Sequence, residues 1–330
     1  MMAFARAVAT WGGVSVLGAV LGFVSSGIVA SFVSWRWMFA IPIAVSALGL
    51  RAGGRLLPAG RPLHTQRRPA RDPLGAVLAT GGIMFASFGL IASHDTSWKS
   101  PMVGGSVTVG VALLIAFLIV ERRAQDPLLP PAFLLDMLRA VGLLGTFLAA
   151  AVSLLIEFVF LTYLQQTRGW TSFETAASFL PFAFGLIVTN LLAAAAVGKF
   201  GAKATLVTGF LVAGASLAWL SVLDSTTAYF TTLMPAQVLL AIGIALVFSG
   251  AAVLATANVA QEQTGLAGGV MNTAMELGPT VGFALLMAVA ATRADVVDGY
   301  AIAFGTAAAC CGLAAVATLL VATASRGASA

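Results

Sequence analysis

The sequence predicts an all-α membrane protein, a polytopic bundle of about ten transmembrane helices. Hydrophobic residues make up 60% of the 330 residues and charged residues only 9%, with a mean hydropathy of +1.00. Such a composition leaves too little polar surface to coat a water-soluble globule. The apolar residues also gather in ten stretches, most of them close to the roughly 20 residues that a helix needs to cross a hydrocarbon core. Because backbone groups in lipid must bond within their own segment, helices are favoured over strands.

Taken in order along the chain, the ten predicted spans are 12–33, 36–57, 74–93, 102–120, 140–164, 173–198, 204–223, 228–257, 265–292 and 299–324. The second span is the least regular, since its uninterrupted apolar run from Trp37 to Leu50 has only 14 residues. For that helix to cross, the side chains of Arg51 and Arg55 must extend to the headgroups, or the bilayer must thin beside it. We keep this span because omitting it would invert every later loop.

The basic residues predict the orientation of the chain in the membrane. With residue 1 inside the cell, four of the 17 Lys and Arg residues fall on the outer side, and the other 13 fall on the inner side. The four outer ones are Arg36, Lys99, Arg168 and Arg293. Cationic loops are retained in the cytoplasm. We therefore expect a multi-pass protein of the cell (inner or plasma) membrane, with both termini cytoplasmic.

Several other classes of protein are disfavoured. The net charge of +5 is spread over loops without interleaved aromatic residues, which argues against nucleic acid as a partner. The densest basic group, Arg51 to Arg71, is typical of a linker lying on anionic headgroups. His64, His94 and the adjacent Cys310 and Cys311 form no metal-binding set, so we expect no metal. We find no nucleotide-binding loop or nucleophile–base spacing, so we expect neither a cofactor nor an enzyme.

Glycine and serine recur at helical spacing in two distant spans. Gly18, Gly22 and Ser26 are four residues apart in the first span, and Gly278 and Gly282 repeat that spacing in the ninth. Small residues at this spacing let helices approach closely in lipid. A shift of 256 positions superposes Gly22 on Gly278 and Ser26 on Gly282, which indicates a parallel internal repeat of the kind found in secondary transporters. The helix-packing positions are Gly18, Gly22, Phe23, Ser26 and Gly27 in the first span and Gly278, Pro279 and Gly282 in the ninth.

The first span and the residues after it resemble a known family. The run from Gly18 to Gly27, followed by Ser34-Trp35-Arg36-Trp37-x-Phe39, is similar to the antiporter motif in the fifth helix of major facilitator superfamily exporters. More closely, it resembles the fourteen-helix drug:proton antiporters. Further matches are Leu164-Gln165 with Gly169, Leu180-Pro181, and the run from Gly265 to Gly278. The resemblance covers essentially the whole chain and implies helices five to fourteen of that family, with the first four helices absent.

The chain also departs from the family pattern. The antiporter motif has Phe23 where a Pro is expected and Ser26 where a Gly is expected. The loop Gly198-Lys199-Phe200-Gly201-Ala202-Lys203 resembles the cytoplasmic gating loop of the second half, with Lys199, Gly201 and Lys203 as its matching residues, yet Gly198 replaces the usual Asp.

The resemblance implies a division of the chain into three helical parts and two linkers. The parts are residues 1–57, the last two helices of an amino-terminal bundle; 58–73, a basic cytoplasmic linker; 74–121, two additional central helices; 122–139, a second cytoplasmic linker; and 140–330, a complete carboxy-terminal six-helix bundle.

Glu157 and Glu276 are the only acidic residues well inside predicted spans. A carboxylate in hydrocarbon is costly unless it is protonated, paired or facing a wet cavity, so both are proton-coupling candidates. Glu276 lies one turn from Asn272 and next to the Gly278-Pro279 break, where a loosened helix could expose backbone carbonyls. In the alternative interpretation Glu276 is a neutral acid bonded to a neighbouring helix, and Glu157 extends towards Arg168.

A set of polar and aromatic side chains in the carboxy-terminal part could line a substrate cavity. Polar groups beside aromatic rings suit large amphiphilic or cationic solutes. The same amides could instead bond helices together, and the same rings could face lipid. The set consists of Asn272, Asn190, Gln165, Gln237, Phe158 and Tyr163.

Two hypotheses for function follow. The resemblance implies a proton-coupled secondary transporter that exports small hydrophobic or cationic compounds by alternating access, with the lipid bilayer, a small-molecule substrate and protons as its partners. The alternative is a truncated or split membrane module without transport activity of its own, which packs with a partner supplying the missing amino-terminal helices.

Overall fold

The computed structural model of the protein is helical in all its regular elements. It describes residues 34–56, 72–92, 100–123, 135–257 and 263–327, together with a few isolated positions. Eight helices within these ranges are long and apolar enough to cross a membrane. They are Pro73–Leu90, Pro101–Glu121, Met137–Thr167, Ser172–Phe200, Ala202–Leu220, Tyr229–Ala255, Thr264–Ala290 and Val296–Val321. The structure thus confirms the predicted fold class, and these eight spans correspond to the third to tenth predicted ones.

The first two predicted spans have a different outcome. Span 12–33, including Phe23 and Gly27, lies largely outside the described residues. The second span contains a short 3-10 helix η1 (Trp35–Phe39) and then α2 (Ala40–Leu56), whose 17 residues are fewer than predicted. From Ala40 to Arg55, every residue of α2 except Gly53 is exposed.

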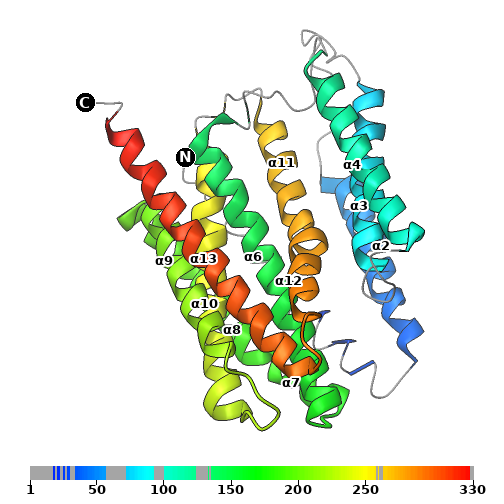
Figure 1. Ribbon diagram of the computed structural model, residues 1–330, viewed down its shortest axis with the longest axis vertical. Coiled ribbons are helices and arrows are strands. Elements are labelled where there is room, and N and C mark those ends of the chain that lie inside the picture. The colour runs from blue at the N-terminus through cyan, green and yellow to red at the C-terminus, as the bar shows by residue number, and fades with distance from the viewer. Residues whose placement is uncertain are drawn as a thin grey trace.

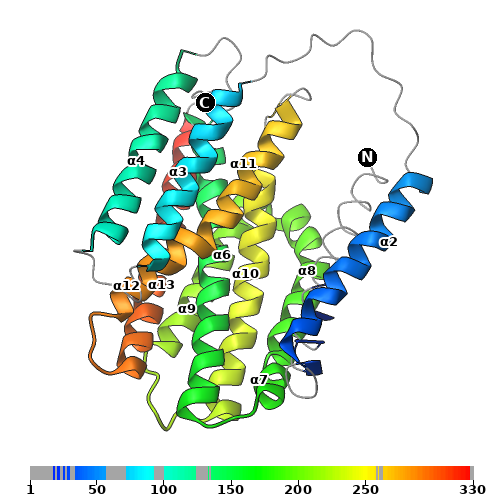
Figure 2. The ribbon, with the colours of Figure 1, turned by 90° about the vertical axis from the view of Figure 1, so that its right-hand side faces the viewer.

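Helices α3 (Pro73–Ala92) and α4 (Pro101–Glu121) form a hairpin beside the main bundle (Figure 2). A serine at the start of α4, Ser100, caps it by accepting a hydrogen bond from the backbone N–H of Met102. The two helices touch where glycine removes the side chain, since a Cβ at Gly110 would lie 2.8 Å from the Cβ of Ala86. The hairpin meets the main bundle through α3, which contacts the middle of the ninth predicted span.

The remaining helices form the main bundle in two layers (Figures 1 and 2). Helices α8, α10, α6 and α11 lie side by side in that order, and α9 and α13 pack behind them. We call the open side of the first layer, which faces the viewer in Figure 2, the front face. The elements are α6 (Met137–Thr162), η2 (Tyr163–Thr167), α7 (Ser172–Ser178), α8 (Leu180–Phe200), α9 (Ala202–Leu220), η3 (Tyr229–Leu233), α10 (Met234–Ala255), α11 (Thr264–Leu277), η5 (Gly278–Gly282), α12 (Phe283–Ala290) and α13 (Val296–Gly327).

The bundle has two ends of different character. Arg139, Lys199 and Lys203 lie at the end where α6, α9 and α11 begin, which we call the basic end. Tyr163 and Asp224 lie at the other end, which we call the opposite end.

Helices α9 and α10 approach each other at three glycines along their length. A Cβ at Gly209 would lie 2.6 Å from the backbone nitrogen of Val247, and one at Gly250 would lie 2.8 Å from that of Leu206. Beyond Gly209, towards the C-terminal end of α9, a Cβ at Gly243 would lie 2.8 Å from the Cα of Ala213. Close backbone contact of this kind is how helices gain packing energy where water expulsion contributes little.

Candidate functional site

The exposed side of α11 carries the polar residues predicted for a proton site. Gly265, Gly268, Gly269, Asn272 and Glu276 recur at helical spacing, and all five are exposed. A Cβ on any of the three glycines would meet no atom within 4 Å. The amide of Asn272 and the carboxylate of Glu276 therefore lie together, one turn apart, on the exposed side of α11.

The helix changes form directly after Glu276. Residues Gly278–Gly282 make the π-helical segment η5, and Pro279 has no N–H to donate to the carbonyl of Met275. The hydroxyl of Thr280 donates to the carbonyl of Glu276 at 3.0 Å. Single π-helical turns inside helices are frequent at functional sites. Glu276 thus lies beside backbone carbonyls that the regular helical pattern leaves free.

Two glycines hold this break against α6. A Cβ at Gly282 would lie 2.6 Å from the Cβ of Ala151, and Gly278 packs against Ala150 just as closely. The level of Glu276 in the bundle is therefore close to that of Ala150 on α6. In contrast, a Cβ at Gly18 or Gly22 would meet no described atom within 4 Å.

Glu157 lies on the same side of α6 as Ala150, because residues seven apart share one helix face. It is half-buried, and it makes no hydrogen bond or ion pair with the described residues. Its position is about 10 Å beyond Ala150 towards the opposite end, at 1.5 Å per residue. The neighbouring ring of Phe158 packs edge-on against Phe283 of α12, with 5.3 Å between ring centroids.

The expected approach of Glu157 to Arg168 is not formed. A guanidinium nitrogen of Arg168, Nη1, donates instead to the backbone carbonyl of Ser225 at 3.4 Å. The reason is position, since Arg168 lies beyond the π-helical segment η2 and faces the loop between α9 and α10.

Tyr163, predicted to line a cavity, is buried at the opposite end. Its hydroxyl donates to the backbone carbonyls of Asp224 at 2.8 Å and Thr227 at 3.3 Å. The exposed carboxylate of Asp224 accepts a hydrogen bond from the hydroxyl of Thr226, which lowers the pKa of Asp224 below its usual range. Tyr163 therefore ties α6 to the turn between α9 and α10.

The other amides proposed for a cavity occupy three different environments. Gln237 is 0% exposed and lies inside the bundle, where its Nε2 donates to the backbone carbonyl of Ser178 at 2.7 Å. Gln165 is half-buried in η2 at the opposite end, and Asn190 is half-buried in α8. The structure thus brings Asn272 and Glu276 together and places Gln165 and Gln237 away from them.

The loop between α8 and α9 lies at the basic end. Gly201 ends α8 with φ +83°, a conformation that glycine adopts without steric cost. Its carbonyl accepts hydrogen bonds from the N–H of Thr205 at 3.1 Å and from the hydroxyl of Thr205 at 2.9 Å. Lys199 is exposed, with its Nζ 5.2 Å from the ring centroid of Phe200, and Lys203 is half-buried.

Arg139 has a structural role that the sequence does not reveal, because a basic residue just before an apolar span is typical of a cytoplasmic loop. It is 6% exposed, and its Nη1 donates to the backbone carbonyl of Phe133 at 2.6 Å. Its Nη2 donates to the carbonyl of Ala257, just beyond α10, at 3.4 Å. The ring of Phe133 covers the guanidinium at 3.8 Å. Asp136, which caps α6, was the one local signal that a helix begins here.

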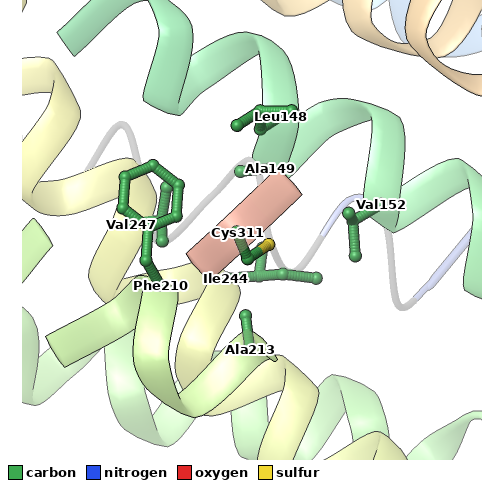
Figure 3. A pocket seen from close by; sticks show the side chains of 8 residues that line it. All are labelled: Leu148, Ala149, Val152, Phe210, Ala213, Ile244, Val247 and Cys311. Atoms are coloured by element: carbon green, nitrogen blue, oxygen red, sulfur yellow. The ribbon is translucent and has the colours of Figure 1, made fainter. Parts of the chain in front are cut away.

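The space between α6, α9, α10 and α13 is closed to solutes. A cavity of about 10 Å³ with entirely apolar walls lies between these helices. Figure 3 shows the side chains that line it, including the sulfur of Cys311. An apolar space of this size stays empty even of water. The lining residues are Leu148, Ala149, Val152, Phe210, Ala213, Ile244, Val247 and Cys311. A solute has no room in this cavity.

Comparison with known proteins identifies the class. Residues 142–329 match the model of the Major Facilitator Superfamily, and this chain belongs to that family. The match covers the six-helix bundle described above and confirms the family named from the sequence motifs.

The chain is also similar to several curated proteins of actinomycetes. It is 35% identical to the puromycin resistance protein of Streptomyces alboniger, over 89% of this chain and 58% of that protein. It is 31% identical to the lincomycin resistance protein of Streptomyces lincolnensis, over 84% of this chain and 56% of that protein. A third relative, the tetracenomycin C resistance and export protein of Streptomyces glaucescens, is 31% identical, over 87% of this chain and 53% of that protein. The chain therefore spans little more than half the length of these relatives.

Proposed function

We propose that this protein is a secondary transporter of the efflux type, which exports small hydrophobic or cationic compounds from the cell by alternating access. The observation that carries the proposal is the pair Asn272 and Glu276 on the exposed side of α11, just before the π-helical segment η5. The names of the relatives, which refer to antibiotic resistance and export, support the same class of activity.

Glu276 is the residue that we propose to carry the coupled proton. A carboxylate at membrane depth is unfavourable unless it binds a proton or faces a cation or water. Protonation of Glu276 from the outside would release a cationic solute, and loss of the proton to the cytoplasm would reset the site. Glu157, about two turns further along the bundle, is the second proton-coupling candidate.

The substrate would bind on the front face. Asn272 would supply a hydrogen-bonding amide next to Glu276, and the rings of Phe158 and Phe283 would supply apolar surface near Glu157. Asn190 and Gln165 remain proposed contacts because both side chains are half-buried and make no hydrogen bond with described residues. A partner that supplies four further helices would pack against this same face.

The membrane arrangement is part of the proposal. We propose that residues 1–330 correspond to helices five to fourteen of a fourteen-helix drug:proton antiporter in the cell membrane, with both termini cytoplasmic. The loop Lys199, Gly201 and Lys203 would then act as a cytoplasmic gating loop. Its position at the basic end, beside the start of α9, supports this assignment.

A flux measurement with Glu276→Gln tests the proton step. The chain is reconstituted in liposomes and offered a fluorescent lipophilic cation while a pH gradient is imposed, and uptake is recorded with and without an ionophore that collapses the gradient. We expect gradient-driven uptake by the unaltered chain and its loss in Glu276→Gln, because the amide cannot take up a proton. Detergent chromatography should show the same monodisperse peak for both.

Glu174→Gln is the matched control. Glu174 is exposed and occupies the N3 position of the capping box at Thr171, a position where Gln serves as well as Glu. Its flux should equal that of the unaltered chain. Unchanged pH-dependent flux in Glu276→Gln would remove Glu276 from the mechanism, and absence of flux in the unaltered chain would count against transport by this chain alone.

A further inference from the structure

A group of buried hydrogen bonds joins α10 to the junction between α7 and α8. α7 ends at Ser178 and α8 begins at Leu180, with Pro181 next in the chain. Proline supplies no N–H, so the regular hydrogen-bond pattern is interrupted at this bend. The carbonyl of Ser178 accepts one hydrogen bond from the hydroxyl of Tyr229 at 2.7 Å and another from Nε2 of Gln237 at 2.7 Å.

The three groups form a closed triangle inside the bundle. Nε2 of Gln237 also donates to the hydroxyl of Tyr229 at 3.0 Å. Ser178, Tyr229 and Gln237 are all buried. The ring of Trp170, on the loop leading into α7, lies 5.2 Å from the ring of Tyr229. Tyr229 and Gln237, both near the start of the α10 span, therefore hold the bend between α7 and α8.

The amide oxygen of Gln237 is not used in this arrangement. Oε1 is buried and accepts no hydrogen bond from the residues that the structure describes. Leaving a buried acceptor without a donor is unfavourable, and an apolar side chain of similar size would avoid that cost. Stability of this one conformation therefore does not account for an amide at position 237.

We propose that Gln237 is a positioning residue: with Tyr229 it forms a latch that fixes the bend between α7 and α8. The latch opens when the bend changes during the transport cycle, and Oε1 of Gln237 then gains the donor that it lacks here. The opening step rests on the proposed transport function, whereas the fixed bend does not.

Cysteine labelling at the bend tests the latch without any need for transport. The chain has two cysteines, so Cys310→Ala with Cys311→Ala gives a cysteine-free background. Ser178→Cys in that background keeps the backbone carbonyl and places a thiol at a buried position. Its rate of reaction with a membrane-impermeant maleimide, in intact liposomes, reports how often the bend opens.

Loss of either donor should open the bend. We expect Gln237→Leu and Tyr229→Phe each to raise the labelling rate of the Ser178→Cys thiol by about tenfold, the order expected when a hydrogen bond of ordinary strength is removed. Because both donors share one carbonyl, the double variant should show less than the product of the two single effects. The thermal midpoint of Gln237→Leu should change little, since the variant also removes the unsatisfied Oε1.

Ser216→Ala is the matched control. Its hydroxyl is buried and donates to the carbonyl of Ala236, one residue before Gln237, at 2.6 Å. This variant loses a comparable buried hydrogen bond away from the bend and should leave the labelling rate unchanged. Equal labelling rates in Ser216→Ala and Gln237→Leu would indicate general loosening of the bundle and contradict the latch. An unchanged labelling rate in both Gln237→Leu and Tyr229→Phe would also contradict it.

Two further measurements distinguish failure of the latch proposal from poor insertion of a variant and from failure of the transport proposal. Gln237→Met preserves an unbranched side chain of similar length, so if Gln237→Leu fails to insert, Gln237→Met should show the same rise of about tenfold in labelling rate. Where flux is present, an open latch should alter the turnover rate more than the concentration of substrate at half-maximal flux. Loss of flux in the unaltered chain would contradict the transport proposal and leave the labelling result intact.

Discussion

Arg139 shows how one residue can join distant parts of a membrane bundle. It carries its charge at a nearly buried position, and its described partners are two backbone carbonyls and the face of Phe133. Ala257 lies just past the end of α10, where the helix dipole favours a cation. The flat guanidinium can contact both carbonyls and the ring at once, which an ammonium group cannot do. Arg139 thus connects the start of α6 to the segment that leads into α11.

We predict that Arg139→Gln lowers the free energy of unfolding by about 1–3 kcal/mol, because one buried and one partly buried carbonyl lose a charged donor. Arg139→Lys should recover only part of this loss. Thermal unfolding in detergent, followed by tryptophan fluorescence, measures both.

Arg122→Gln serves as the comparison, since Arg122 is an exposed arginine at the end of α4. It should unfold at the same temperature as the unaltered chain. Equal destabilisation by Arg139→Gln and Arg122→Gln would show that the carbonyl contacts contribute nothing specific.

At the scale of single residues, the sequence predicted which groups are unusual but not which way they face. Glu276 was identified as an acid beside a helix break, and the structure shows that break as η5. Gln237 and Tyr163 were expected at a cavity but are buried between helices. Helices that are apolar on all sides carry no periodic signal to tell a bundle-facing position from a cavity-facing one. Arg139 was missed because a basic residue near a helix start is expected in a cytoplasmic loop.

Among the helices, the pair α9 and α10 depends on glycine for its close contact. At Gly243 the nearest atoms to an added Cβ belong to the backbone of Ala213, which cannot move aside as a flexible side chain could. Gly243→Ala must therefore push the two helices apart. We predict a loss of about 1–3 kcal/mol in the free energy of unfolding, the usual cost of overpacking.

The matched variant is Gly268→Ala on α11, where an added Cβ meets nothing within 4 Å. It should leave the unfolding midpoint unchanged in the same detergent assay. If Gly243→Ala proves equally harmless, the contact between α9 and α10 is looser than described.

At this scale the sequence predicted the helices well and their interruptions poorly. The spans expected at 74–93 and 102–120 differ from α3 and α4 by only one residue at each end. In contrast, the single span expected at 173–198 is two helices, α7 and α8, with a bend at Phe179. A hydropathy profile depends on composition, so it does not reveal a local change in the backbone hydrogen-bond pattern. Proline gave a chemical reason for a break in both places, Pro181 beside the bend and Pro279 in η5, but only the break at Gly278-Pro279 was predicted.

For the molecule as a whole, the two ends of the bundle differ in the charges they expose. Lys199 is exposed at the basic end, and Ser225 is exposed in the turn at the opposite end. If basic loops face the cytoplasm, these two positions lie in different compartments.

We predict that Ser225→Cys, in the cysteine-free background, reacts with an impermeant maleimide added to intact cells. Lys199→Cys should react only after the cells are opened, and its labelling then serves as the control for thiol reactivity. Labelling of both positions in intact cells would contradict the proposed orientation.

The glycine contacts between α9 and α10 make this pair of helices a rigid unit, on which a second conformation of the protein can be superposed. Backbone meets backbone at three levels, so neither helix can slide or tilt against the other without steric overlap. The pair offers a fixed reference for superposition. Displacements measured from that reference should be largest for α11, whose exposed glycines touch no neighbour, and smallest for the segments that flank Gly209, Gly243 and Gly250.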